Sequence, residues 1–248
     1  MTAWPPIDEP ELRARLALPD DAFRQALIDM ARAIGPREFT EELYEHALRY
    51  PWPRPQTSYL LDDGVIHELD GLDERAAREL VAGAAAGRYP LLAFGSNGAP
   101  ERLALKFAHL EPEQRRILVI AGELHDFDVG VSALPAVYGA MPATIVPSPG
   151  TAVRACVLWS SAEHVTALTR TELSYALGRL DPVRFGADVP SAPPVASVLA
   201  YASRWGAHRV AGDVVALAGV SARGRRAPAL TQEELLGGVA REALAPDA

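Results

Sequence analysis

The sequence YPLLAFGSNG, residues 89–98, contains the transition that decides the fold. A short apolar run leads into the turn Gly95-Ser96-Asn97, after which the pattern becomes helix-like from Pro100. A strand that turns through a glycine into a helix leaves several backbone N–H groups pointing into one concavity, which suits a carboxylate or a phosphate. Taken alone, glycine, serine and asparagine are also ordinary turn residues, so a purely structural turn stays open.

The chain after this turn alternates short apolar runs with turn residues, a pattern typical of β-strands. Helical patterns interrupt these runs at about residues 99–109 and 161–171. The order predicts a mixed α+β fold. The apolar runs occupy residues 116–132, 142–150, 153–159, 196–203 and 208–220.

The chain before the turn divides at a proline-rich segment, YPWPRPQTS, residues 50–58. Its prolines remove backbone N–H donors and favour extended geometry, so no helix continues through it. We therefore interpret residues 1–56 as a helical N-terminal extension. Apolar residues recur there at helical spacing near residues 22–31 and 43–48, which predicts two amphipathic helices.

Turn and capping residues predict the elements on either side of these segments. Asp63-Gly64 separates two apolar runs and is typical of a tight hairpin, and a helix that ends at Gly87 follows. These are the first elements of a predicted domain of residues 57–222. Thr231 and Glu234 form a capping box, so we expect residues 223–248 to contain a C-terminal helix that packs on this domain.

Composition excludes several classes of protein. A chain of 248 residues, 49% of them hydrophobic, is long enough to bury a core, and its net charge of −8 argues against a nucleic-acid partner. The single cysteine, Cys156, excludes an internal disulfide framework and a cysteine-built zinc site. Since no secretory signal or long apolar segment occurs, we expect a soluble, cytoplasmic protein without a membrane partner.

Motifs for metals and nucleotides are missing. The six histidines include no pair at helical spacing, so no metal site is expected. The Walker pattern, the GxGxxG fingerprint and the GxSxG elbow are all absent, and we expect no cofactor. The only lysine, Lys106, follows no glycine-rich loop, and we interpret the excess of arginine as codon bias of a GC-rich, bacterial genome.

Three segments, in this order and at these separations, resemble the gamma-glutamylcyclotransferase family. They are the turn Gly95-Ser96-Asn97, the stretch from Ala143-Thr144-Ile145 through a Pro149-Gly150 turn to Trp159, and Glu172 after a short helix. The resemblance covers about residues 89–220. It implies a mixed, barrel-like α+β sheet with flanking helices, a loop that binds a gamma-glutamyl group, and no cofactor.

The resemblance also implies roles for individual residues. Glu172 would be the single general base and acid, and Phe94, Gly95, Ser96 and Asn97 would bind the substrate. Tyr175 either donates a hydrogen bond to the substrate carboxylate or is an amphipathic tyrosine at the rim. The implied partner is a small gamma-glutamyl compound, while the oligomeric state stays open.

The implied reaction is an intramolecular aminolysis. The α-amine of the substrate attacks its own side-chain carbonyl, giving 5-oxoproline and a free amine. Because both reacting groups belong to one molecule, the enzyme must chiefly hold the folded-back conformer, stabilise the oxyanion and move one proton. A carboxyl group such as that of Glu172 can take the proton from the amine and return it to the leaving group.

Two departures from the family leave an alternative open. The family usually has tyrosine where this chain has Phe94, and about 90 residues precede the turn, whereas the family's first strand typically lies near the amino terminus. The alternative is a catalytically inactive member of the fold that acts as a small-molecule binding or interaction module.

Overall fold

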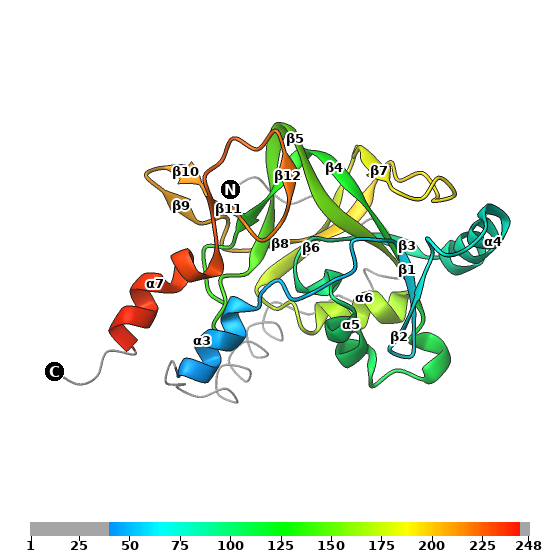
Figure 1. Ribbon diagram of the computed structural model, residues 1–248, viewed down its shortest axis with the longest axis horizontal. Helices are drawn as coiled ribbons and strands as arrows, with labels where there is room; N and C mark the ends of the chain where they lie inside the picture. Colours follow the sequence, from blue (N-terminus) through cyan, green and yellow to red (C-terminus); the bar gives the residue numbers. More distant parts are fainter. Residues whose placement is uncertain (1–39, 244–248) are drawn as a thin grey trace.

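The computed structural model describes residues 40–243, which form a mixed α+β structure around one large sheet (Figure 1). The α+β class predicted from the sequence is therefore confirmed. The helix predicted near residues 22–31 lies outside the described residues. The helical elements are α3 (Glu41–Leu48), α4 (Glu74–Ala85), α5 (Pro100–Phe107), α6 (Ala162–Thr169), α7 (Gln232–Ala243) and the 3₁₀ turns η1 (Ser96–Gly98) and η2 (Pro112–Gln114).

The described strands fall into one large sheet and one small two-stranded ribbon, β9 with β10. They are β1 (Tyr59–Asp62), β2 (Val65–Glu68), β3 (Tyr89–Ala93), β4 (Ile117–Val131), β5 (Ala143–Ser160), β6 (Tyr175–Leu180), β7 (Phe185–Ala187), β8 (Val198–Ser203), β9 (Arg209–Val210), β10 (Asp213–Val214), β11 (Ala216–Leu217), β12 (Ala222–Arg223) and β13 (Ala229–Leu230).

The large sheet is organised around the long antiparallel pair β4 and β5, the green strands of Figure 1. Its main order is β13-β11-β4-β5-β3-β8-β6, with β1 and β7 also paired to β4 and β12 to β5. The pairs β3–β8 and β11–β13 are parallel and the others antiparallel. Since β6 and β13 each pair on one side only, the described strands do not close, and the closed form of the expected barrel-like sheet is not found.

Strand β5 corrects one expectation. The stretch Pro149-Gly150 was expected to end a strand, but β5 continues through it to Ser160. The pairing steps from Phe127 opposite Pro147 to His125 opposite Ala152, so residues 148–151 stand opposite a single residue. The proline-glycine stretch is thus a bulge in a continuous strand. The residues before it and after it both pair with β4, and this pairing outweighs the preference of Pro149-Gly150 for a turn.

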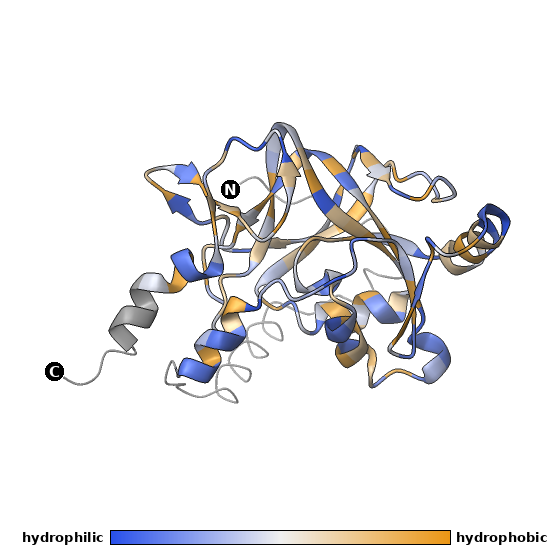
Figure 2. Cartoon of the chain, viewed as in Figure 1, coloured by the Kyte–Doolittle hydropathy of each residue, from blue (hydrophilic) through white to orange (hydrophobic). Residues whose placement is uncertain are grey.

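The two faces of the sheet bury two separate cores. Along β3, Leu91 and Ala93 pack into one core, whereas Leu92 and Phe94 pack into the other, as the period-two alternation of a strand requires. Figure 2 shows hydrophobic residues along the strands, while the helices also carry hydrophilic residues. Helices α5 and α6 cover the first face through the buried residues Leu103, Phe107, Val165 and Leu168.

Several local predictions are confirmed. Strands β1 and β2 form the expected hairpin, in which Asp63 and Gly64 have φ angles of 43° and 85°. Helix α4 begins after Asp73, whose side chain accepts the Ala76 N–H at 2.9 Å. Helix α7 follows the predicted capping box.

The second predicted helix of the extension is α3, but the chain after it does not stand apart from the domain. Tyr50 and Trp52 follow α3 directly and are buried in the core with Phe94. The segment of residues 49–58 then leads into β1 (Figure 1). Residues assigned to the extension therefore contribute to the same core as the sheet. No helix of the described chain is long and apolar enough to cross a membrane.

His164 joins α6 to the 3₁₀ turn η2. Its side chain is fully buried, and its ring stacks on Phe107 with 4.5 Å between centroids. The Nδ1 atom accepts the Ser161 N–H at 3.2 Å, so Nε2 carries the proton and donates to the Gln114 carbonyl at 2.5 Å. Burial, the largest cause, lowers the pKa of His164 to about 4.

This shift predicts a loss of stability in mild acid. Between pH 6.5 and 4 the unfolded chain binds a proton at His164 that the folded protein excludes, so the free energy of unfolding falls as pH falls. A shift of this size corresponds to about 3 kcal/mol. Urea unfolding at pH 7.5 and 4.5 should show a clearly smaller loss for His164→Gln than for the wild type; equal losses would contradict this assignment.

Candidate functional site

The predicted turn lies between strand β3 and helix α5. Gly95 precedes η1, and Ala99 and Pro100 lead into α5. The first amides of a helical turn have no acceptor within the helix, and neither the Ser96 nor the Asn97 N–H has a backbone acceptor among residues 40–243. The Ser96 N–H interacts instead with the Tyr50 hydroxyl. The sequence thus correctly predicts a strand, turn and helix here.

Gly95 is packed against Tyr50, a residue of the preceding extension. A Cβ atom built on Gly95 would lie 2.5 Å from the Tyr50 hydroxyl oxygen and 3.3 Å from the Ala143 Cβ. That hydroxyl oxygen accepts the Ala143 N–H at 2.8 Å. Burial, opposed mainly by this amide, raises the pKa of Tyr50 above its ordinary value, so the phenol stays neutral. Only glycine fits at position 95.

The carboxyl group of Glu172, from the turn after α6, contacts the turn at residues 95–97 directly. Glu172 follows α6 in a tight turn, in which its N–H donates to the Thr169 carbonyl at 3.1 Å and its carbonyl accepts the Tyr175 N–H at 2.9 Å. The Thr171 hydroxyl donates to the Leu168 carbonyl at 2.8 Å and fixes the same turn. The backbone of Glu172 is therefore anchored on both sides.

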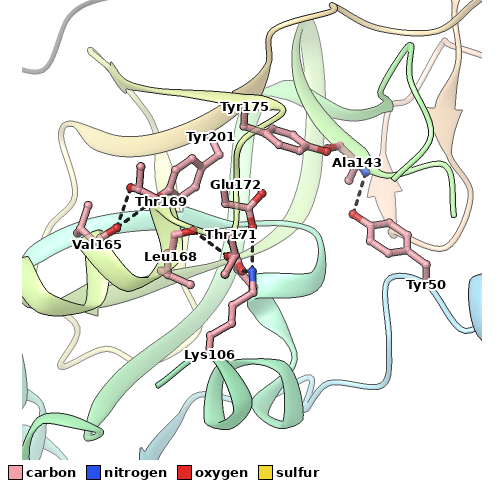
Figure 3. A network of polar contacts seen from close by, with 11 residues as sticks. Tyr50, Lys106, Ala143, Val165, Leu168, Thr169, Thr171, Glu172, Tyr175 and Tyr201 are labelled. Carbon is pink, nitrogen blue, oxygen red and sulfur yellow. Dashed lines mark hydrogen bonds and ion pairs between the residues drawn. The ribbon is translucent and has the colours of Figure 1, made fainter. Parts of the chain in front are cut away.

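Asn97, Lys106 and Glu172 form one connected network. The Lys106 Nζ donates to Glu172 Oε1 at 2.9 Å and to Asn97 Oδ1 at 2.7 Å, while Asn97 Nδ2 donates to the same Oε1 at 3.1 Å. The side chains of Lys106 and Glu172 are each only 12% exposed. In Figure 3 the Lys106 side chain extends from α5 to the carboxylate of Glu172. The turn and the carboxylate are thus in direct contact.

The network binds only one of the two carboxylate oxygens. No hydrogen bond to Glu172 Oε2 occurs within residues 40–243, and this oxygen is not sealed from solvent. The Lys106 ammonium group forms an ion pair with the carboxylate through Oε1 alone. Glu172 therefore presents a fixed carboxylate oxygen that is free to accept a proton.

These groups line a cavity of about 580 Å³. Asn97, Lys106 and Glu172 lie together in its wall, and hydrophobic residues form another part of that wall. Leu105, Leu134 and Val137 are 65%, 43% and 48% exposed although they are large and apolar. Exposed apolar residues grouped around a cavity indicate a binding surface. The cavity therefore has both a polar region and an apolar region.

The charged residues of the cavity wall are mainly basic. Arg102, Lys106 and Arg170 line the cavity, whereas Glu172 is the one acidic residue among the described residues of its wall. Within a chain of net charge −8, this local excess of cations favours a ligand that carries an anionic group.

Tyr175 lines the cavity, but its hydroxyl has a protein acceptor. It donates to the Ala143 carbonyl at 2.8 Å (Figure 3). A hydroxyl has one proton, so Tyr175 has none left for a substrate carboxylate in this arrangement. Tyr50 differs, because its oxygen accepts an amide proton and its own proton has no acceptor among residues 40–243.

Phe94 is buried in the core on the face away from α5 and α6, where it is 5% exposed. Its carbonyl accepts a hydrogen bond from the Arg54 Nη1 at 3.1 Å. The hydroxyl that a tyrosine would carry at position 94 is missing, and the Tyr50 hydroxyl lies beside the adjacent Gly95.

Sequence reasoning missed Lys106 and Tyr50. Lys106 had a signal, because it is the only lysine among the 24 lysine and arginine residues of the chain, a bias that by itself indicates codon usage. Tyr50 had no such signal, because its contact with Ala143 spans 93 positions. No cluster of three or more potential metal ligands occurs in the described part of the chain.

Comparisons with protein-family models, curated proteins and solved structures found no match to this chain.

The close contact at Gly95 predicts a specific coupling between two substitutions. Gly95→Ala places a Cβ against the Tyr50 hydroxyl and should destabilise the protein by about 1–3 kcal/mol. Tyr50→Phe removes that oxygen, so the same Gly95→Ala change should cost clearly less in the Tyr50→Phe background. Chemical denaturation of the four proteins measures the coupling. Strictly additive losses would show that the two residues do not meet.

Proposed function

We propose that the protein is a gamma-glutamyl cyclotransferase-type enzyme that converts a small gamma-glutamyl amide into 5-oxoproline and a free amine. The observation that carries the proposal is the contact between Glu172 and the turn at residues 95–97, made through Asn97 at 3.1 Å. The resemblance that suggested this chemistry requires that contact. The fold proposed with it is an open form of the family's mixed α+β sheet.

The carboxylate of Glu172 is suited to act as the base. The α-ammonium group of the substrate must lose a proton before it can attack, because an α-amine is mostly protonated at neutral pH. Oε2 of Glu172, which has no hydrogen-bond partner among residues 40–243, accepts this proton, while Oε1 stays bound to Lys106 and Asn97. The ion pair and hydrogen bond thereby hold the base in place throughout the reaction.

The reaction then needs one bond to form and one to break. The α-nitrogen attacks the side-chain carbonyl carbon, and the carbonyl oxygen becomes an oxyanion that backbone N–H groups of the turn stabilise. The tetrahedral intermediate collapses with cleavage of the bond to the leaving nitrogen. Glu172 returns its proton to that nitrogen, and the second proton of the ring nitrogen then passes through the same carboxylate to the released amine. 5-Oxoproline and a protonated amine leave, and the carboxylate is regenerated.

The shape of the cavity orients the substrate. The gamma-glutamyl group occupies the polar region, where Asn97, Lys106 and Glu172 meet and where basic residues attract its carboxylate. The amine portion lies toward the apolar region formed by Leu105 and Val137. A substrate with both a charged and an apolar part fits this wall.

The test is turnover of a panel of gamma-glutamyl compounds with detection of 5-oxoproline. The panel contains gamma-glutamyl amides of apolar amines and of charged amines. We expect Glu172→Gln to lower kcat by about 10²- to 10⁴-fold, because the amide cannot take the proton. Glu101→Gln, which changes an exposed glutamate on α5 outside the cavity, is the matched control and should retain full activity.

Two results would overturn the proposal. The first is full turnover by Glu172→Gln. The second is no turnover of any compound together with calorimetric binding of one of them, which would support the alternative of an inactive binding module. The long chain before the turn motivates that alternative, because its residue Tyr50 contributes to the cavity wall.

A further inference from the structure

A second cavity of about 310 Å³ lies beside the chain segment that links α3 to β1. Residues of this segment, from Arg49 to Gln56, form one side of it, and strands β4 and β5 form another. Ala121, Ala155 and Cys156 line the strand side, and Gly219 and Ser221 complete the wall. None of these strand or loop residues belongs to the wall of the first cavity.

The wall of this second cavity carries basic but no acidic residues. Arg49, Arg54 and Arg154 line it, and no aspartate or glutamate appears among its described lining residues. Arg154 is neutralised by Asp188, with nitrogen–oxygen distances of 2.7 and 3.0 Å. The other two arginines have no carboxylate within ion-pair distance in the part of the chain that the structure describes.

Arg54 lines this cavity, and one edge of its guanidinium group is unpaired within the described chain. Its Nη1 atom donates to the Phe94 carbonyl at 3.1 Å and approaches the Gly95 carbonyl at 3.5 Å. Its Nε and Nη2 atoms have no hydrogen-bond partner among residues 40–243, and neither is sealed from solvent. A guanidinium edge with two parallel N–H groups matches the geometry of a carboxylate or a phosphate.

Other groups in the wall do not compensate this charge. Burial raises the pKa of the Cys156 thiol, so the sulfur is uncharged at neutral pH and is no counter-ion for Arg54. The prolines at positions 51, 53 and 55 and the Trp52 ring also line the cavity and carry no charge. A partly buried cation without a counter-ion favours binding of an anion from solution.

We propose that the second cavity binds a small oxyanion, a carboxylate or a phosphate group, through the free Nε and Nη2 edge of Arg54, with Arg49 as a second cation. Through Nη1, the same guanidinium donates to the carbonyl of Phe94, directly before the turn of the first cavity, and to that of Gly95, the first residue of the turn. The bound oxyanion and the turn therefore share one side chain. Binding of the oxyanion at this site does not require the reaction proposed for the first cavity.

The test follows the Trp52 indole by ¹H–¹⁵N NMR in the full chain, because Trp52 is the one tryptophan in the described wall of the second cavity. Sodium phosphate, sodium acetate and sodium chloride are titrated at equal ionic strength, and Trp52→Phe assigns the signal. We expect a saturable shift with phosphate or acetate that chloride does not produce. The tighter of the two identifies the class of ligand.

Three variants locate the anion. Arg54→Met should raise the dissociation constant at least tenfold, and Arg49→Met should raise it less. Arg170→Met is the matched control, since Arg170 is an exposed arginine of the first cavity, and it should leave the constant unchanged. If Arg54→Met does not fold, Arg54→Lys decides, because it keeps the charge, loses the planar edge and should still weaken binding.

Three outcomes would overturn the proposal. One is a Trp52 signal that responds to phosphate and acetate no more than to chloride. Another is an unchanged dissociation constant in the folded Arg54 variant. The third is loss of the shift in Arg170→Met, which would assign the anion to the first cavity.

Discussion

The chemistry of the first cavity depends on a carboxylate that is held by one oxygen. Glu172 Oε1 accepts from both Lys106 and Asn97, whereas Oε2 has no partner in the described chain. A carboxylate bound through both oxygens would be a structural group, and one bound through neither would have no fixed position. Binding through one oxygen fixes the group and leaves it able to accept a proton, which is what a general base requires.

The segment of residues 49–56 connects the two cavities. Tyr50, in the wall of the first cavity, contacts the turn, and Arg54, in the wall of the second, donates to the carbonyls of Phe94 and Gly95. The turn is therefore enclosed by a segment that precedes the sheet in the chain. This packing explains why a side chain at Gly95 would collide with Tyr50 and why one at Gly98 would approach Arg54 at 2.9 Å.

The sequence predicts the elements that local chemistry decides. The strand, turn and helix around Gly95, the hairpin at Asp63-Gly64 and the capped helix α7 follow from spacing and turn residues. The continuation of β5 through Pro149-Gly150 does not, because pairing with β4 overrides a local turn signal. The open ends of the sheet are likewise set by long-range pairing.

The sequence predicts the candidate site only in part, because some of its residues are brought together by long-range packing. The resemblance placed Glu172 near Asn97, and the contact supports that placement. Lys106 completes the network from helix α5, nine positions after Asn97, and its role depends on how α5 packs on the sheet. Tyr50 enters from outside the matched segments, so no pattern within residues 89–220 could reveal it.

The most direct measurement traces the α-nitrogen of a substrate. A gamma-glutamyl amide labelled with ¹⁵N at its α-amine is incubated with the protein, and the products are observed by NMR. Attack by that nitrogen, with Glu172 as the base, would deliver the label into the lactam ring of 5-oxoproline alongside unlabelled amine. Formation of ¹⁵N-glutamate by hydrolysis, or recovery of every labelled amide unchanged, would contradict the proposed reaction.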